Sequence, residues 1–408
     1  MTPLIFTFPN GIRLLYIEST GEISHCGLMI GSGSRDESKG KEGLAHFIEH
    51  VLFKGTRKRS ATQVLNRLDI VGGELNAYTS KEETCVHASM LHTHFERAAE
   101  LVTDIVFNSQ FPVKEIEKEK EVVLDEINSY QENPAEQIFD DFECLMFRGQ
   151  PLGNPVLGTP ESVRSFSRKD ILNFTKQHYT SDRMVFVYSG NIPFEKVKSI
   201  LGNYITNQKR KVHLNKKTGS KTLINKHVVD SRSVTHCHYI SGSIAYSSQN
   251  KKRFPLFLLN NILGGPGMNS RLNMQLREKY GYTYNVESAY MVYRDTGLFN
   301  VYFAAEPKFL EKCKILVEKE FNRLKNDRIS DSWLTKYKYQ LKGQIAIGQE
   351  NNASVMLNSA KSILVYDKPL NISEVFKRID AITSSEILEV ANEILNDKKM
   401  SSLLYRPL

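Results

Sequence analysis

The sequence predicts an α+β fold of two duplicated domains, each an antiparallel or mixed β-sheet with helices packed mainly on one face. Two observations support this prediction. A basic polar stretch at 207–222 divides the 408-residue chain into a first domain, 1–206, and a second domain, 223–408. Both segments open with short β-type runs and then show helical periodicity, so the same order of elements occurs twice.

The first segment begins with two predicted strands, within TFPNGIRLLYIES (7–19) and SHCGLMIGSGS (24–34). Asn10 and Gly11 form the dipeptide that is typical of a tight hairpin turn. Apolar residues three and four positions apart then predict helices, and MVFVYSGNI (184–192) returns to strand. The predicted helices are near 43–54, 61–71, 94–107, 113–132 and 168–177.

The second segment repeats this order. INKHVVD (224–230) and SVTHCHYISGS (233–243) are predicted strands, and YTYNVESAYMVY with GLFNVYFAAE forms a long hairpin. Helices are predicted at 251–263, at 270–279 and through most of 307–396, before a last strand, SSLLYRPL.

Composition excludes several classes of protein. With 40% hydrophobic and 25% charged residues, the chain is typical of an ordinary globular protein. No apolar run approaches the roughly 18 residues that a membrane span needs, and the N-terminus lacks the features of a signal peptide. The five cysteines are scattered without a CxxC pair, which fits reduced thiols. We therefore expect a cytoplasmic protein without a membrane partner.

The linker holds a cluster of basic residues: Lys209, Arg210, Lys211, Lys216, Lys217 and Lys221. Such a cluster could bind nucleic acid. No aromatic side chains interleave to stack on bases, however, and the net charge of +8 is modest for this length. A solvated linker is the better interpretation, and we expect no nucleic-acid partner.

Residues 43–55, GLAHFIEHVLFKG, place titratable groups inside an apolar helix. His46, Glu49 and His50 project from one face, because residues three and four apart are neighbours on a helix. Two imidazoles one turn apart can bind one metal ion, and zinc favours nitrogen-rich tetrahedral sites. The alternative is a pair of hydrogen-bonded core histidines beside an acid.

A catalytic zinc needs a third protein ligand and leaves its fourth position to water. The helix KEIEKEKEVVLDEINSYQEN (114–133) offers candidates, since Glu119 and Glu126 are seven apart and share a face. Periodicity alone does not choose among Glu119, Asp125 and Glu126. These acids could also form a solvated helix face.

Three stretches together, HFIEHVLFKGT, GGELNAYTSKEETC and EKEKEVVLDEI, resemble the pitrilysin/insulysin family of inverzincin zinc metallopeptidases. The likeness is greatest to the mitochondrial-processing-peptidase-like subfamily and covers essentially the whole chain. It implies a Zn²⁺-dependent endopeptidase that cleaves peptides or unfolded, extended segments inside a chamber. The resemblance makes His46, His50 and Glu126 the zinc ligands, Glu49 the general base and Glu119 an auxiliary carboxylate.

The resemblance also gives a role to GGELNAYTS, which by itself would be a plain hairpin. Asn76, Ala77 and Tyr78 match an open edge strand that pairs with extended substrate backbone. Arg277 and Tyr284 lie seven apart across a glycine and match a clamp that reaches the substrate beside the zinc, where they could stabilise oxyanion charge.

Glu136 and Asp140 share a helix face after Pro134 and could simply form a solvated acidic surface. In the processing peptidases, acids at these positions hold an arginine of the substrate, which implies a preference for basic residues near the scissile bond. One chain carries both half-sites, which favours an active homodimer in which the second chain completes the active site. The alternative function is a non-catalytic, peptide-holding subunit of a larger complex. That role predicts loss of the motif residues, which are all intact.

Overall fold

The computed structural model describes residues 3–205, 225–369 and 371–408, and the predicted linker lies outside them. The described chain forms two compact units. The first comprises 3–128, 154–205 and 348–369, and the second comprises 129–153, 225–347 and 372–408. Each unit is therefore assembled from both halves of the sequence.

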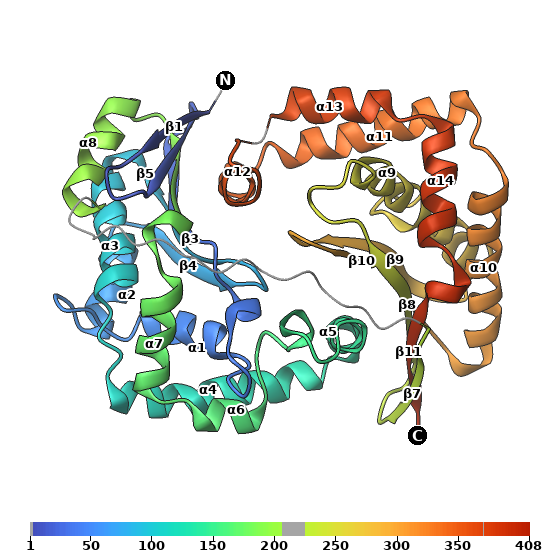
Figure 1. The fold of residues 1–408 in the computed structure, drawn as a ribbon, viewed down its shortest axis with the longest axis horizontal. Coiled ribbons are helices and arrows are strands. Elements are labelled where there is room, and N and C mark those ends of the chain that lie inside the picture. The colour runs from blue at the N-terminus through green and yellow to red at the C-terminus, as the bar shows by residue number, and fades with distance from the viewer. Residues whose placement is uncertain (1–2, 206–224, 370) are drawn as a thin grey trace. The chain divides into compact units, whose positions relative to one another are not determined.

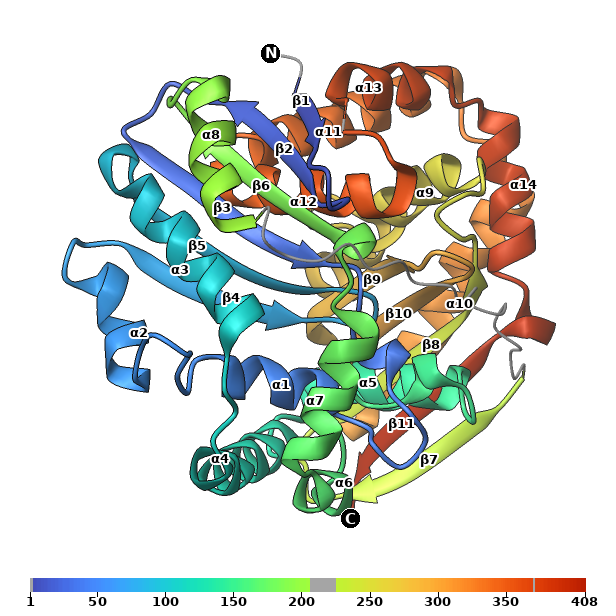
Figure 2. The same cartoon turned by 60° about the vertical axis from the view of Figure 1, so that its left-hand side comes forward.

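The first unit is built on a six-stranded mixed sheet (Figures 1 and 2). The order across the sheet is β1 (Leu4–Thr7), β2 (Arg13–Glu18), β6 (Met184–Gly190), β3 (Ile23–Ile30), β5 (Thr84–Leu91) and β4 (Glu74–Thr79). Only β2 and β6 pair in parallel, and every other neighbouring pair is antiparallel. β4 is an edge strand, which leaves one side of its backbone free of sheet partners.

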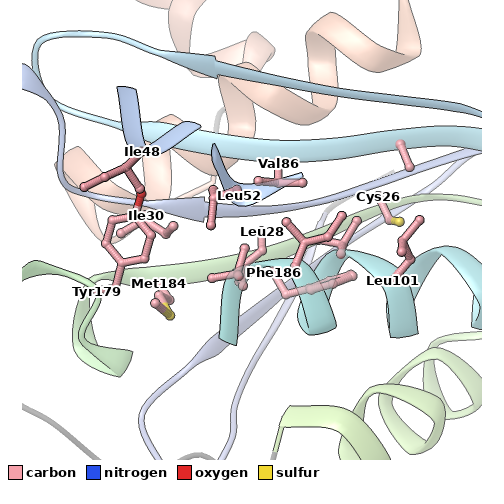
Figure 3. Packing of buried hydrophobic residues seen from close by; sticks show 14 of the residues in the cluster. Cys26, Leu28, Ile30, Ile48, Leu52, Val86, Leu101, Tyr179, Met184 and Phe186 are labelled. Carbon is pink, nitrogen blue, oxygen red and sulfur yellow. The ribbon is translucent and has the colours of Figure 1, made fainter. Parts of the chain in front are cut away.

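Most helices of this unit lie on one face of the sheet. They are α1 (Leu44–Leu52), α2 (Ala61–Asp69), α3 (Phe95–Asn108), α4 (Val113–Gln131), α6 (Pro160–Ser165), α7 (Arg168–His178) and α8 (Phe194–Ile205). Figure 3 shows the core beneath them, where Ile48 and Leu52 of α1 pack over Ile30 and Val86 of the strands.

The opposite face of the first sheet is covered by α12 (Asn352–Tyr366), which comes from the second half of the sequence (Figure 1). Side chains alternate between faces along a strand. Phe186 of β6 therefore points to the main core, whereas Val185 and Val187 pack with Met356 and Ile363 of α12. Both faces of the central strands are buried.

The second unit is built on a five-stranded sheet. Its order is β7 (His227–Arg232), β11 (Ser401–Pro407), β8 (Cys237–Ala245), β10 (Gly297–Ala305) and β9 (Thr283–Val292), with β7 and β11 parallel. Its remaining helices are α9 (Arg253–Gly264), α10 (Leu310–Asn326), α11 (Asp331–Gly348), α13 (Ile372–Ala381), α14 (Ser384–Ile394) and a π-helical segment, Asn273–Lys279. On the other face lies α5 (Pro134–Met146), which comes from the first half of the sequence (Figure 1).

Six short 3-10 turns complete the described structure: Ser34–Asp36, His92–His94, Pro151–Gly153, Ser181–Arg183, Pro307–Phe309 and Asp397–Lys399. The five cysteines all lie in the described residues and form no disulfide.

The two sheets have the same topology once β1 is set aside. In each, the first strand pairs in parallel with the last, followed by the second, the fourth and the third strand in chain order. The predicted α+β fold with two repeated sheets is confirmed. The predicted elements are present with boundaries shifted by a few residues, and segment 270–279 ends as a π-helix. The sequence pattern did not predict β5, α6 or α8.

Candidate active site

Two features fix where α1 begins. Gly43 precedes the helix with a positive φ of 89°, and a Cβ there would lie 2.6 Å from the Cα of Gly158, so only glycine fits. The buried Glu37 carboxylate accepts hydrogen bonds from the backbone N–H of Gly43 (2.9 Å) and Ala45 (2.8 Å). These contacts satisfy N–H groups that the first helical turn cannot pair internally.

The two histidines of α1 face Glu126 of α4. The Nε2 atoms of His50 and His46 lie 3.3 and 3.7 Å from the Oε2 atom of Glu126. Ligand atoms of the three residues all lie within 4.8 Å of one another, and no other such group of three occurs in the described residues. The structure thus brings together three of the predicted site residues, which come from two helices.

This group has the chemistry of a zinc site. Two imidazole nitrogens and one carboxylate oxygen are a standard donor set for catalytic zinc, and they leave a fourth position open. The Oε2 atom of Glu126 is buried, and within the described structure its ion-pair partners are the imidazoles of His50 and His46. A buried carboxylate oxygen is costly unless something compensates it. A bound cation would provide that compensation, so the residues present fit zinc.

The histidines differ in their protonation. Burial, reinforced by the neighbouring His50, lowers the pKa of His46 to about 4. Burial also lowers the pKa of His50, but the carboxylates of Glu119 and Glu126 outweigh it and raise that pKa to about 9. His46 is therefore neutral at pH 7, which is the form that binds metal, whereas His50 holds a proton that a metal would displace.

Glu119 supports His50 from behind. Its Oε1 atom lies 3.1 Å from Nδ1 of His50, and its Oε2 atom lies 2.6 Å from the ammonium group of Lys54. The carboxylate is almost fully buried. A carboxylate on the second ring nitrogen fixes the orientation and tautomer of a metal-binding histidine. Glu119 thus contacts the ring nitrogen of His50 that faces away from Glu126, where a carboxylate could orient the imidazole.

Glu49 lies one helical turn after His46 and directly before His50, outside the group of converging ligand atoms. Its Oε2 atom accepts a hydrogen bond of 2.6 Å from the hydroxyl of Thr79, at the end of β4. Burial raises the pKa of the Glu49 carboxyl, and the hydrogen bond from Thr79 only partly offsets this. A raised pKa suits a carboxylate that must take up and release a proton near neutral pH.

β4 lies beside α1 at the edge of the first sheet (Figure 2). A backbone hydrogen bond of 2.8 Å from Ser80 to Glu83 closes the turn between β4 and β5. Paired residues of an antiparallel ladder alternate between hydrogen-bonded and non-bonded positions. The backbone groups of Ala77 and Thr79 therefore point to the free edge, whereas Asn76 and Tyr78 pair with β5.

The remaining predicted site residues belong to the second unit. Arg277 lies on the π-helical segment, and Tyr284 at the start of β9 is 90% exposed. π-helical segments occur frequently at functional sites. Glu136 is exposed and Asp140 half-buried, both on α5, which begins at Pro134 as predicted.

The sequence pattern missed Glu37, Lys54 and Thr79. Lys54 directly follows the HxxEH helix and Thr79 ends the predicted edge strand, so proximity to a motif was the only available signal. Their partners depend on contacts between elements that periodicity does not predict.

Comparison with known proteins identifies the family of this chain. The family description "Insulinase (Peptidase family M16)" matches residues 13–160, which include α1, β4 and all of α4. "Peptidase M16 inactive domain" matches residues 165–341. An uncharacterised zinc protease of Mycobacterium leprae is 32% identical over 98% of this chain and 90% of the relative. The chain belongs to peptidase family M16.

Another relative, the uncharacterised zinc protease YmxG of Bacillus subtilis, is 30% identical over 98% of this chain and 97% of its own length. This M16 protein is a zinc metalloprotease and therefore a hydrolase. No helix in the described residues is long and apolar enough to cross a membrane.

Two solved structures share the fold. A protease from Helicobacter pylori superposes with a TM-score of 0.91 at 20% identity, covering 100% of both chains. The peptidase M16 inactive domain from Pseudomonas fluorescens superposes with a TM-score of 0.92 at 17% identity, covering 100% of this chain and 98% of that one.

The contact between Glu119 and His50 generates a prediction. Glu119→Gln should lower zinc affinity about 10–100-fold, because a neutral amide orients and polarises the imidazole less well. Competition with a chromophoric chelator measures this affinity. Glu121→Gln, an exposed acid on the same helix, is the control and should bind zinc normally. Equal affinities for the two variants would contradict the orienting role of Glu119.

Proposed function

We propose that this M16 protease is an endopeptidase that cleaves peptides or unfolded, extended segments, with His46, His50 and Glu126 as zinc ligands and Glu49 as general base. The observation that supports this most directly is the convergence of two imidazole nitrogens and one carboxylate oxygen, with a separate carboxylate one helical turn away. Zinc bound there would supply a Lewis acid for the scissile carbonyl and lower the pKa of a bound water to about 7.

In this proposal the Glu49 carboxylate removes the proton from the attacking water and later delivers it to the leaving amine. Burial raises the pKa of the Glu49 carboxyl and so brings it closer to the pKa values of a zinc-bound water and of the leaving amine. This favours both proton transfers. Glu119 and Lys54 keep His50 oriented throughout, because their ion pair of 2.6 Å is largely shielded from solvent.

The substrate would bind as an added strand along β4. Outward N–H and C=O groups of Ala77 and Thr79 can pair with any extended backbone, so this contact selects conformation more than sequence. Asn76 and Tyr78 would contact substrate side chains. We infer that the reaction takes place in a closed chamber, as the family resemblance implies.

The first test separates the base from the ligands. Glu49→Gln should lower peptide cleavage by at least about 100-fold while the protein retains about one zinc per chain, because this carboxylate is not a ligand. Glu126→Gln should instead weaken zinc retention, and a chelator should abolish cleavage. Metal analysis and a fluorogenic peptide assay measure both properties. Near-normal turnover by Glu49→Gln would show that the base is another group.

We also propose a homodimer in which Arg277 and Tyr284 of one chain complete the zinc site of the other. The guanidinium and the phenol would stabilise the oxyanion that develops on the scissile carbonyl. The high exposure of Tyr284 is consistent with a contact to a group outside its own unit.

Complementation tests this assembly. A Glu49→Gln chain and an Arg277→Ala chain should each be nearly inactive alone. Co-expressed, they should recover part of the activity, because one site then combines an intact base with an intact arginine. Mass spectrometry should verify the heterodimer. A verified heterodimer without activity would mean that each site is completed within one chain or that Arg277 is dispensable.

Substrate preference is the last part of the proposal. A substrate guanidinium that binds between Glu136 and Asp140 would shield both carboxylates from water and could gain roughly 1.5–3 kcal/mol, about a tenfold to hundredfold preference. We expect cleavage a few residues downstream of Arg or Lys. Glu136→Gln with Asp140→Asn should lower kcat/KM for basic peptides far more than for neutral ones. A digest of an unselected peptide mixture without enrichment of basic residues would reject this preference.

A further inference from the structure

The Glu49 carboxylate is held by a residue outside the motif. Thr79 Oγ1 lies 2.6 Å from Glu49 Oε2, and this is the one hydrogen bond to that carboxylate in the described part of the chain. The hydroxyl must donate, because an ionised carboxylate only accepts. Oε1 is then the oxygen that remains available for a proton.

We propose that Thr79 is a positioning residue for the general base, which ties the orientation of Glu49 to the strand that binds substrate. The inference rests on the proposed role of Glu49. A glutamate side chain has several rotatable bonds and loses much freedom when it is ordered. One short, charge-assisted hydrogen bond from a fixed strand selects one of its orientations.

The support for Thr79 is rigid. It precedes the turn between β4 and β5, which is closed by the backbone bond from Ser80 to Glu83. The next residue, Lys81, donates from its ammonium group to the carbonyl of Asn154 at 2.6 Å.

The same turn is also held by two ion pairs. Glu82 is bonded to Arg35 at 2.8 Å in a buried pair whose side chains are 7% and 6% exposed. Glu83 pairs with Lys361 of α12 at 2.7 Å. Together with the contacts of Ser80 and Lys81, these bonds hold the end of β4 from three directions, so the hydroxyl of Thr79 has a defined position.

Thr79 has a second function at this place. Its side chain points towards α1, while its backbone N–H and C=O face the free edge of β4. A substrate strand that pairs at this edge would therefore bind directly to the residue that orients the base.

Thr79→Val tests the proposal, because valine keeps the shape of threonine and removes the hydroxyl. We expect kcat to fall about 10–100-fold, since small misplacements of catalytic groups cost up to about 100-fold. KM should change less than about twofold, because the backbone edge is intact. Zinc content should remain at one per chain. Thr79→Ser, which retains the hydroxyl, should restore most of kcat.

Thr84→Val is the matched control. Thr84 lies directly opposite Thr79 on β5, and its hydroxyl donates to the carbonyl of Ser32 and makes no bond to Glu49. This variant should lower thermal stability and retain kcat. A crystal structure of zinc-loaded Thr79→Val should show the Glu49 carboxylate in more than one orientation, and Thr79→Ser should show one.

Three results would overturn the inference. Thr79→Val could retain kcat while Glu49→Gln is inactive, Thr79→Ser could lose as much activity as Thr79→Val, or the loss could appear in KM alone. If Glu49→Gln itself turns over normally, the proposed general base is wrong and the inference falls with it. The parallel Glu49→Gln assay thus distinguishes the two failures.

Discussion

Burial of one face of α1 is the constraint on which the site depends. Phe47, Ile48, Val51 and Leu52 are fully buried against the first sheet. Packing of that face fixes the orientation of the helix about its axis. The directions of the other side chains are then fixed as well, so the two histidines project together from another face. The histidine pair is thus a consequence of core packing, with the Glu37 carboxylate stabilising the first turn.

The side chains that contact α1 at the site come from two other elements, α4 and β4, which pack in the same hydrophobic core. α4 brings Glu126 to the Nε2 atoms of the two histidines and Glu119 to Nδ1 of His50. β4 brings the hydroxyl of Thr79 to Glu49. Carboxylates that are withdrawn from water, such as those of Glu119 and Glu49, destabilise the fold unless they are paired. The ion pair with Lys54 stabilises Glu119, and the hydrogen bond from Thr79 stabilises Glu49.

α12 and α5 each cover a sheet formed mainly by the other half of the sequence, which we call the exchange of helices. The apolar character of the central strands explains it. Side chains of β6 are buried on both faces, so a single layer of helices would leave one face exposed to water. In each unit the second layer is one helix from the other half of the sequence. Each unit therefore contains residues from both halves of the chain, and the first unit, which holds α1 and most of α4, includes α12 from beyond 348.

Sequence alone predicted what is local. The helix with the HxxEH motif, the edge strand and the repeated α+β order could be predicted from the spacing of apolar residues. Periods of 3.6 and 2 residues specify which side chains share a face of a helix or a strand. The sequence limited the candidates for a third metal ligand to Glu119, Asp125 and Glu126, but helical periodicity could not choose among them. The tertiary structure distinguishes these three acids, because the position of α4 relative to α1 brings Glu126 to the Nε2 atoms of the two histidines and Glu119 to Nδ1 of His50. The contact of Thr79 and the exchange of helices were likewise decided by packing between segments distant in sequence, which no local pattern records.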